Sequence, residues 1–268
     1  DIGQATDADI TNGSGSVNSI FKSITEDDDN VYFTVTSALV ITISKSENLL
    51  NKTIHVETEG ELKNVLGDYD YANTGSLKIT GVLNDADFVV INQMPKLKDL
   101  DIAEVNITEL PSRAFYESTN VENLILPNTL TTIGHYEFSK SKLQTVVIPA
   151  SVETIKTQAF GACKSLETVT FGKGSQLKTI GGSAFSGCTT LTYIKIPTKV
   201  ETIEMSAFAS CSSLATVTFE EWSQLKTIGE SAFIACRALN TVDMSNCAQV
   251  EKLESDAFRF NEKLQLFK

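Results

Sequence analysis

The sequence is poor in the residues that most catalytic and nucleic-acid-binding sites use. Only two histidines, one tryptophan and three arginines occur in 268 residues, and 22 basic side chains are set against 34 acidic ones. The formal net charge is −12, which repels a polyanion unless a strongly basic patch offsets it. The sequence contains no such patch, so we exclude nucleic acid as a partner.

Long hydrophobic runs and reactive motifs are also missing. The longest apolar run, Ala38–Ile43, is interrupted by Thr42 and is far shorter than the roughly 18 residues of a membrane-spanning helix. We find no Ser–His–Asp set, glycine-rich phosphate loop, HExxH motif or CxxC pair. The acidic run Asp27–Asp29 lacks the ligand spacing of a calcium-binding loop. We therefore expect no cofactor, no metal and no catalytic activity.

Internal repetition is the strongest signal that the sequence does contain. The segment FGKGSQLKTIGGSAFSGC at 171–188 returns at 219–236 as FEEWSQLKTIGESAFIAC. A phenylalanine, usually preceded by alanine, recurs every 22 to 25 residues at Phe115, Phe138, Phe160, Phe185, Phe208, Phe233 and Phe258. An apolar pair around TI precedes each phenylalanine, and an LxxVxI segment follows it. Each unit is therefore predicted to hold one strand, a second short extended piece and a brief helical turn.

Such a unit is too small to fold alone. Burial of about six apolar side chains contributes roughly 1.5–3 kcal/mol for each side chain. Ordering the 22 to 25 residues of the unit costs about 1.5 kcal/mol for each residue, which is more in total. Stacked units bury both faces of every neighbour. The sequence therefore predicts a repeat solenoid, mainly β with short helical turns, in which parallel strands about 4.8 Å apart form one continuous sheet.

The composition divides the chain into three segments. Residues 1–30 are rich in Gly, Ser, Asn and Asp and are predicted to be a flexible acidic N-terminal tether. Residues 31–75 contain alternating segments at Val31–Ile43 and Lys52–Thr58 and a helical pattern at Gly60–Asp68. They are predicted to form a β/α cap on the open edge of the sheet, with a separate small β-domain as the alternative. Residues 76–268 are predicted to be a solenoid of about eight turns.

The cysteines follow the repeat. Four of them stand three residues after a repeat phenylalanine, at Cys163, Cys188, Cys211 and Cys236. Parallel Cβ vectors about 5 Å apart fit a disulfide poorly, so we expect buried, unreactive thiols that pack as small hydrophobic groups. Cys247 lies outside this register, in a loop insertion, and is either a plain loop residue or the one cysteine with reactivity worth testing.

The pattern LxxVxIPxxVxTIxxxAFxxCxxL, present at Leu143–Leu166 and Leu191–Leu214, resembles the BspA-like (Treponema pallidum type) leucine-rich repeat. Upstream, Gly75–Ile107 resembles the entry turns of such repeats in surface proteins of Bacteroides and its relatives. The departures are few, such as Glu137 in place of alanine before Phe138. The resemblance implies a right-handed leucine-rich-repeat superhelix with a parallel sheet and an N-terminal cap.

The same resemblance implies where the protein works and with what. It implies a secreted or cell-surface protein, commonly an outer-membrane lipoprotein, whose only membrane contact is an N-terminal lipid anchor that these 268 residues do not contain. It also implies adhesion to a protein of the host or of a neighbouring cell, with matrix proteins such as fibronectin and fibrinogen as partners. No binding residues transfer from the family, because its motif specifies the scaffold.

The candidate binding residues come from the outward positions of the strands. These positions form a flat face of Thr, Val and Ile with Tyr193 and Lys195 near its middle, and the candidates on it are Thr168, Thr170, Tyr193, Lys195, Thr216 and Thr218. Tyrosine suits a protein contact, although Thr and Val are also simply good strand formers. Two long loops of similar sequence follow strands, the first GKGSQL at 172–177 and the second EEWSQL at 220–225. The sole tryptophan, Trp222, lies in the second and either makes contacts or packs over the first. Asp99 and Asp101 are expected to have no basic partner in register.

Together these features predict a non-catalytic adhesion or protein-interaction module that binds through the repeat sheet or the rim loops. Two alternatives remain: a surface glycan-binding protein and, less favoured, a polysaccharide-active enzyme of the β-helix type. Such enzymes need convergent carboxylates or a base with an arginine on neighbouring turns, and the outward columns do not offer that set. Sugar binding favours paired exposed aromatics, whereas the columns offer Tyr193 alone.

Overall fold

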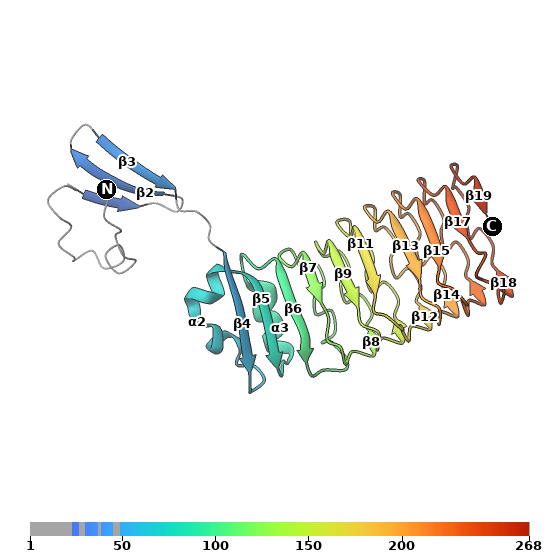
Figure 1. The fold of residues 1–268 in the computed structure, drawn as a ribbon, viewed down its shortest axis with the longest axis horizontal. Helices are drawn as coiled ribbons and strands as arrows, with labels where there is room; N and C mark the ends of the chain where they lie inside the picture. Colours follow the sequence, from blue (N-terminus) through green and yellow to red (C-terminus); the bar gives the residue numbers. More distant parts are fainter. Residues whose placement is uncertain (1–22, 27–29, 37–38, 45–48, 268) are drawn as a thin grey trace. The chain divides into compact units, whose positions relative to one another are not determined.

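The computed structural model describes residues 23–26, 30–36, 39–44 and 49–267. The chain forms two compact units, Asp1–Asn48 and Leu49–Lys268 (Figure 1). In the first unit, β1 (Ser23–Glu26), β2 (Asn30–Thr36) and β3 (Leu39–Ser44) form an antiparallel sheet in the order β1-β2-β3. Most of the predicted tether at 1–30 lies outside the described residues.

The segment expected to form one cap, 31–75, is divided between the two units. Strands β2 and β3 belong to the antiparallel sheet, whereas β4 (Leu50–Val56) pairs in parallel with β5 (Thr74–Gly81) in the second unit. Alternation of apolar residues is the same in both kinds of strand, so the pattern alone does not tell which sheet a strand joins.

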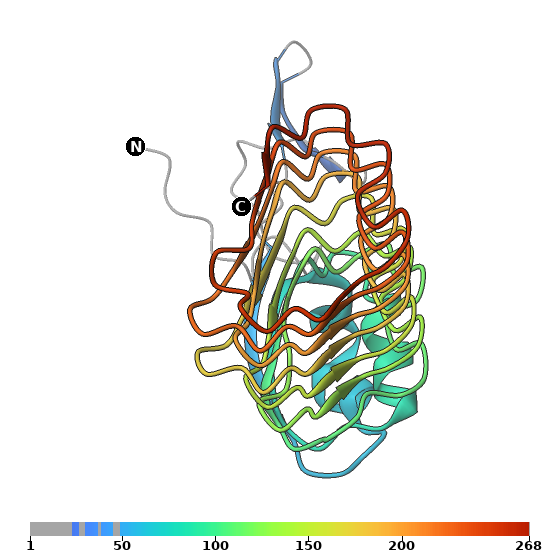
Figure 2. The same cartoon turned by 90° about the vertical axis from the view of Figure 1, so that its right-hand side faces the viewer.

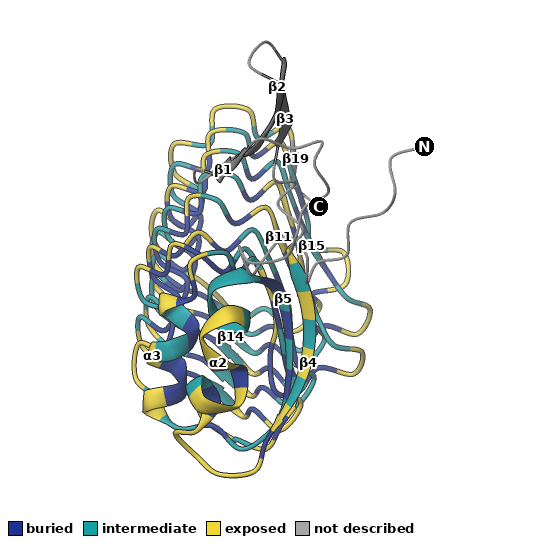
Figure 3. Ribbon diagram, turned by 90° about the vertical axis from the view of Figure 1, so that its left-hand side faces the viewer, coloured by how far each residue is buried: buried dark blue, intermediate teal, exposed yellow. Residues whose placement is uncertain are grey.

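Two helices lie beside the first strands of the second unit. The helix α2 (Leu62–Asn73) extends beyond the predicted 60–68 segment, and α3 (Asp85–Gln93) was not predicted. Figure 3 shows them side by side, each with buried and exposed residues. The buried carboxylate of Asp87 joins them, because it accepts hydrogen bonds from the backbone N–H groups of Gly60, Leu62 and Asn84. Both described helices are too short and too polar to cross a bilayer.

The longer strands of the solenoid run parallel in two sheets. One sheet has six strands in the order β11-β9-β7-β6-β5-β4, and the other has four in the order β13-β15-β17-β19. Besides β4 and β5, their bounds are β6 (Asp99–Val105), β7 (Asn123–Ile125), β9 (Thr145–Ile148), β11 (Thr168–Phe171), β13 (Tyr193–Ile196), β15 (Thr216–Phe219), β17 (Thr241–Asp243) and β19 (Leu266–Phe267).

The apolar TI pairs form a further parallel sheet of two-residue strands. Its six members are β8 (Thr132–Ile133), β10 (Thr154–Ile155), β12 (Thr179–Ile180), β14 (Thr202–Ile203), β16 (Thr227–Ile228) and β18 (Lys252–Leu253). Every pair matches Thr with Thr and Ile with Ile until Lys252–Leu253 ends the column. Figure 2 shows the successive turns of the chain lying over one another. The repeat solenoid of parallel sheets is thereby confirmed.

The prediction of one continuous sheet is wrong at one point, between β11 and β13. There the hydroxyl of Thr190 donates to the carbonyl oxygens of Lys164 (3.0 Å) and Leu166 (2.9 Å). A side chain thus links the two turns where the backbone ladder is interrupted. The stack itself continues, because β12 pairs with both β10 and β14.

The repeat phenylalanines form a ladder through the core. From Phe115 to Phe258, successive rings stack with centroids 4.9–5.4 Å apart and planes within 11° of parallel. The segment around each ring consists of successive turns closed by hydrogen bonds between residues three apart, such as Phe185 O with Cys188 N (3.1 Å). The residues two before and two after each phenylalanine have positive φ, for example Ser183 and Gly187. These residues with positive φ make the segment a series of tight turns, where a short helical turn was expected.

The cysteines of the repeat are buried and free, as predicted. Each thiol also has a polar role, since it donates to the carbonyl oxygen of a phenylalanine in the preceding turn, as in Cys188 Sγ to Phe160 O (3.1 Å). Asn261 replaces the thiol with its side-chain amide at the end of the column. Cys247 lies in a loop, as predicted, and is buried, and burial raises the pKa of its thiol. Both observations favour the plain loop residue over the reactive alternative.

Candidate binding surface

The outward positions of the long strands form two columns in register. The first passes through Ser76, Asp99, Asn123, Thr145 and Thr168, and the second through Lys78, Asp101, Ile125, Val147 and Thr170. In the four-stranded sheet, the columns continue as Tyr193, Thr216 and Thr241 and as Lys195, Thr218 and Asp243. We refer to the residues of both columns together as the strand face.

The six strand-face candidates named from the sequence all lie on this face. Thr168, Thr170, Tyr193 and Lys195 are exposed, and Thr216 and Thr218 are half-buried. The Tyr193 hydroxyl lies 2.8 Å from Thr218 Oγ1 on the neighbouring strand. This hydrogen bond ties the ring to β15 and restricts its rotamers before any partner arrives, which lowers the entropy that a contact would cost.

The strand face also contains two exposed apolar residues that were not among the candidates. Ile125 and Val147 are paired across β7 and β9 and keep 45% and 44% of their surface exposed. Tyr193 is 46% exposed. The sequence indicated these two residues as candidates, because they are apolar in a column whose other members are polar or charged. The repeat pattern alone gave no measure of their exposure.

At the β5–β7 end, the strand face is polar and hydrogen-bonded. Thr145 Oγ1 donates to Asn123 Oδ1 (2.7 Å), and Asn123 Nδ2 donates to Asp99 Oδ1 (2.7 Å). A hollow of about 420 Å³ lies over these strands, and its lining includes Asn51, Ser76, Asp99, Asn123 and Ile125. This end of the face therefore offers both donors and acceptors beside an apolar residue.

The expectation that Asp101 has no basic partner in register is wrong. Lys78 stands opposite Asp101 on the next strand, with Nζ 3.9 Å from Oδ2, and pairs more closely with Glu104 (2.7 Å). The hydrogen bond and the charge of Glu104 raise the pKa of Lys78. The entry strand β5 departs from the repeat pattern, so this lysine was not placed in the column.

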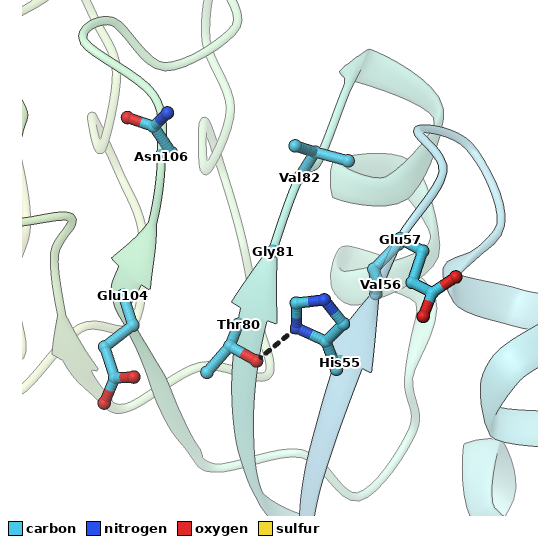
Figure 4. Close-up of a pocket in the computed structure, with 8 residues that line it drawn as sticks. All are labelled: His55, Val56, Glu57, Thr80, Gly81, Val82, Glu104 and Asn106. Carbon is cyan, nitrogen blue, oxygen red and sulfur yellow. Dashed lines mark hydrogen bonds between the residues drawn. The ribbon is translucent and has the colours of Figure 1, made fainter.

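A second hollow, of about 750 Å³, lies at the C-terminal ends of β4, β5 and β6 (Figure 4). His55 and Thr80 share a hydrogen bond of 2.8 Å between Nδ1 and Oγ1, and Glu57, Glu104 and Asn106 line the same hollow. In the described part of the chain, no three His, Cys, Asp or Glu side chains are grouped as metal ligands. The hollow offers hydrogen-bonding groups on an open surface.

The exit loop at 220–224 places Trp222 in solvent. The side chain is 85% exposed, so the alternative that it packs over the GKGSQL loop is wrong. Trp222 follows β15 and therefore belongs to the rim of the solenoid.

The chain is similar to known repeat proteins. The family model described as "BspA type Leucine rich repeat region" matches residues 64–167 and 131–265, with six copies. Among solved structures, a leucine-rich repeat protein from Bacteroides ovatus is 18% identical, with 90% of this chain and 81% of that chain covered and a TM-score of 0.45. The leucine-rich repeat protein of T. pallidum is 26% identical, with 61% and 68% covered and a TM-score of 0.48. The pneumococcal vaccine antigen PcpA is 16% identical, with 91% and 75% covered and a TM-score of 0.39. No curated protein matches the chain.

Proposed function

This chain belongs to the BspA-type leucine-rich repeat family, and on that premise we propose that it is an adhesion module of a cell surface. It binds a protein of the host or of a neighbouring cell through the strand face and carries out no catalysis. Leucine-rich repeat proteins are generally non-catalytic and serve protein interactions or surface roles, which supports the class of function.

The observation that carries the proposal is the exposed apolar content of the strand face. Ile125, Val147 and Tyr193 each leave about 45% of their surface in solvent, on strands locked by parallel ladders. Tyrosine is among the residues that contribute most to binding energy when buried at a protein interface. Lys195 lies on the same strand as Tyr193 and is available to pair with a carboxylate of the partner protein. A preformed face of this kind loses little conformational entropy on binding.

The first partners to test are fibronectin and fibrinogen, which the family resemblance implies. The purified chain is passed over each immobilised protein, and the double variant Tyr193→Ala/Lys195→Glu is expected to bind at least ten-fold more weakly. Met205→Ala serves as the control, because Met205 is a 58% exposed apolar residue outside both columns. Equal binding by the double variant and the wild type would remove the strand face from the proposal.

A glycan remains the second candidate ligand, and the hollow over β4–β7, which mixes hydrogen-bonding and apolar groups, favours it. Asn51, Ser76, Asp99 and Asn123 line that hollow beside Ile125, a combination of hydrogen-bonding groups and an apolar contact that suits a sugar ring. A glycan array with the wild type and Asp99→Asn/Asn123→Ala separates the two candidates. Glycan binding that these substitutions abolish, without binding to either matrix protein, favours the second candidate.

A further inference from the structure

The loop of Trp222 combines features that an ordinary solenoid loop lacks. Among the described residues, Trp222 is the one non-glycine residue with positive φ that does not flank a repeat phenylalanine. Its φ is 60°, in the left-handed region that disfavours a side chain. The equivalent position of the first long loop is Gly174, with φ 74°. The second loop therefore bears a steric cost that a glycine would remove.

Packing does not offset that cost. A Cβ built at Gly174 would meet nothing within 4 Å, so this position of the loop faces open space, and Trp222 is 85% exposed. Within the described part of the chain, no hydrogen bond, ion pair or ring contact involves the side chain of Trp222 or of the adjacent Glu221. Because strained residues that nothing in the fold requires tend to serve function, the large exposed ring is a candidate contact.

The loop holds this ring on a rigid base. Glu220 Oε2 accepts from both Thr198 N and Thr198 Oγ1 (3.1 Å each), and Thr198 Oγ1 also lies 3.1 Å from the carbonyl oxygen of Glu221. On the other side of Trp222, the buried Ser223 accepts from Leu225 N, and Gln224 N donates to Thr198 O (2.8 Å). The backbone on both sides of Trp222 is thus fixed to the preceding turn.

The charges beside the ring indicate the ligand. An indole face is the best side-chain acceptor for a cation, and the exposed carboxylate of Glu221 is next to it in the chain. The nearest lysine along the preceding turn, Lys199, directs its ammonium to Gln176 Oε1. A purely apolar pocket closing over the ring would desolvate Glu221 without a partner. A guanidinium supplies both a cation for an indole face and N–H donors for a carboxylate.

We propose that Trp222 and Glu221 form a rim site for an arginine or lysine side chain of a basic protein segment. The cation lies over the indole face while its N–H groups pair with the Glu221 carboxylate. This site is additional to the strand face, and each is tested with its own variants, so either can fail without the other.

The test uses the fact that Trp222 is the only tryptophan of the chain, so tryptophan emission reports on this loop alone. The probe is an acetylated, amidated peptide of alternating glycine and arginine, and its control replaces each arginine with the neutral citrulline. The arginine peptide is expected to change the emission saturably, and the citrulline peptide to bind at least five-fold more weakly. No saturable change, or an equal response to both peptides, overturns the proposal. So does a response to a neutral oligosaccharide in place of the arginine peptide.

Two variants separate a specific site from general attraction to an acidic protein. Glu221→Gln keeps the fluorophore and is expected to weaken binding about three-fold, the scale of one exposed ion pair. Glu230→Gln removes the same charge at another exposed position and is expected to leave binding unchanged. Equal affinities of these two variants contradict the site. Trp222→Gly is expected to have a Tm equal to or above that of the wild type, because it relieves the left-handed strain, and a lowered Tm would instead assign the ring to the scaffold.

Discussion

The interior and the exterior of this solenoid differ in how far their residues repeat from turn to turn. Inside, the same residue types recur from turn to turn: the phenylalanine rings stack at 4.9–5.4 Å, and the thiols repeat one hydrogen bond to a phenylalanine carbonyl. Outside, the first column changes from Asp99 to Tyr193, and equivalent loops carry Gly174 and Trp222. Stacking requires each turn to fit its neighbours, so the interior is uniform, while the exterior is free to vary.

The largest expected effect comes from breaking the phenylalanine ladder. Phe185→Ala leaves a cavity between two stacked rings at a fully buried position, and we expect a loss of about 3–5 kcal/mol in the free energy of unfolding. Chemical denaturation followed by circular dichroism measures it. Met205→Ala, at an exposed position, is the control and is expected to change stability by less than about 0.5 kcal/mol. A similar small change for Phe185→Ala would contradict the account of the core.

The second effect concerns Glu137, the residue that departs from the uniform interior. It stands where neighbouring turns have Ala114 and Ala159, is buried, and leaves Oε1 without a hydrogen-bond partner. Burial raises the pKa of its carboxyl from 4.5 to about 7. Between these pH values the folded protein keeps a proton that the unfolded chain releases, so stability falls as the pH rises through this window.

Glu137→Gln keeps the shape of the side chain and removes the titration. The wild type is expected to lose up to about 3 kcal/mol between pH 4.5 and pH 8 through this residue, and the variant to lose correspondingly less. Urea denaturation of both proteins across the pH range measures the difference. Parallel stability curves would show that Glu137 does not titrate in this way.

A smaller effect is expected from the cysteine column. Cys188→Ala removes a thiol donor to Phe160 O and leaves a small void, at a cost of about 1–2 kcal/mol. Cys188→Ser retains a donor, as Asn261 does in its own turn, and is expected to lose less in thermal unfolding. If alanine is tolerated better than serine, the thiol acts only as a hydrophobic filler.

Much of the uniform interior could be predicted from the sequence, and much of the exterior could not. The spacing of residues such as Phe185 and Cys188 shows the repeat because identical neighbours must stack in register. The sheet interruption between β11 and β13 coincides with side-chain hydrogen bonds of Thr190, which no period encodes. The place of Lys78 in the column was missed because β5 precedes the regular units, and the exposure of Trp222 depends on a loop conformation rather than on a pattern.

The central claim is that outward residues bind while inward residues support the fold, and one paired measurement tests it most directly. Ile125→Ser/Val147→Ser is compared with the wild type in binding to immobilised fibronectin and fibrinogen and in urea denaturation. The account predicts binding at least ten-fold weaker with an unfolding midpoint close to that of the wild type. Unchanged binding to a matrix protein that the wild type binds, or weaker binding that merely follows a loss of stability, would contradict it.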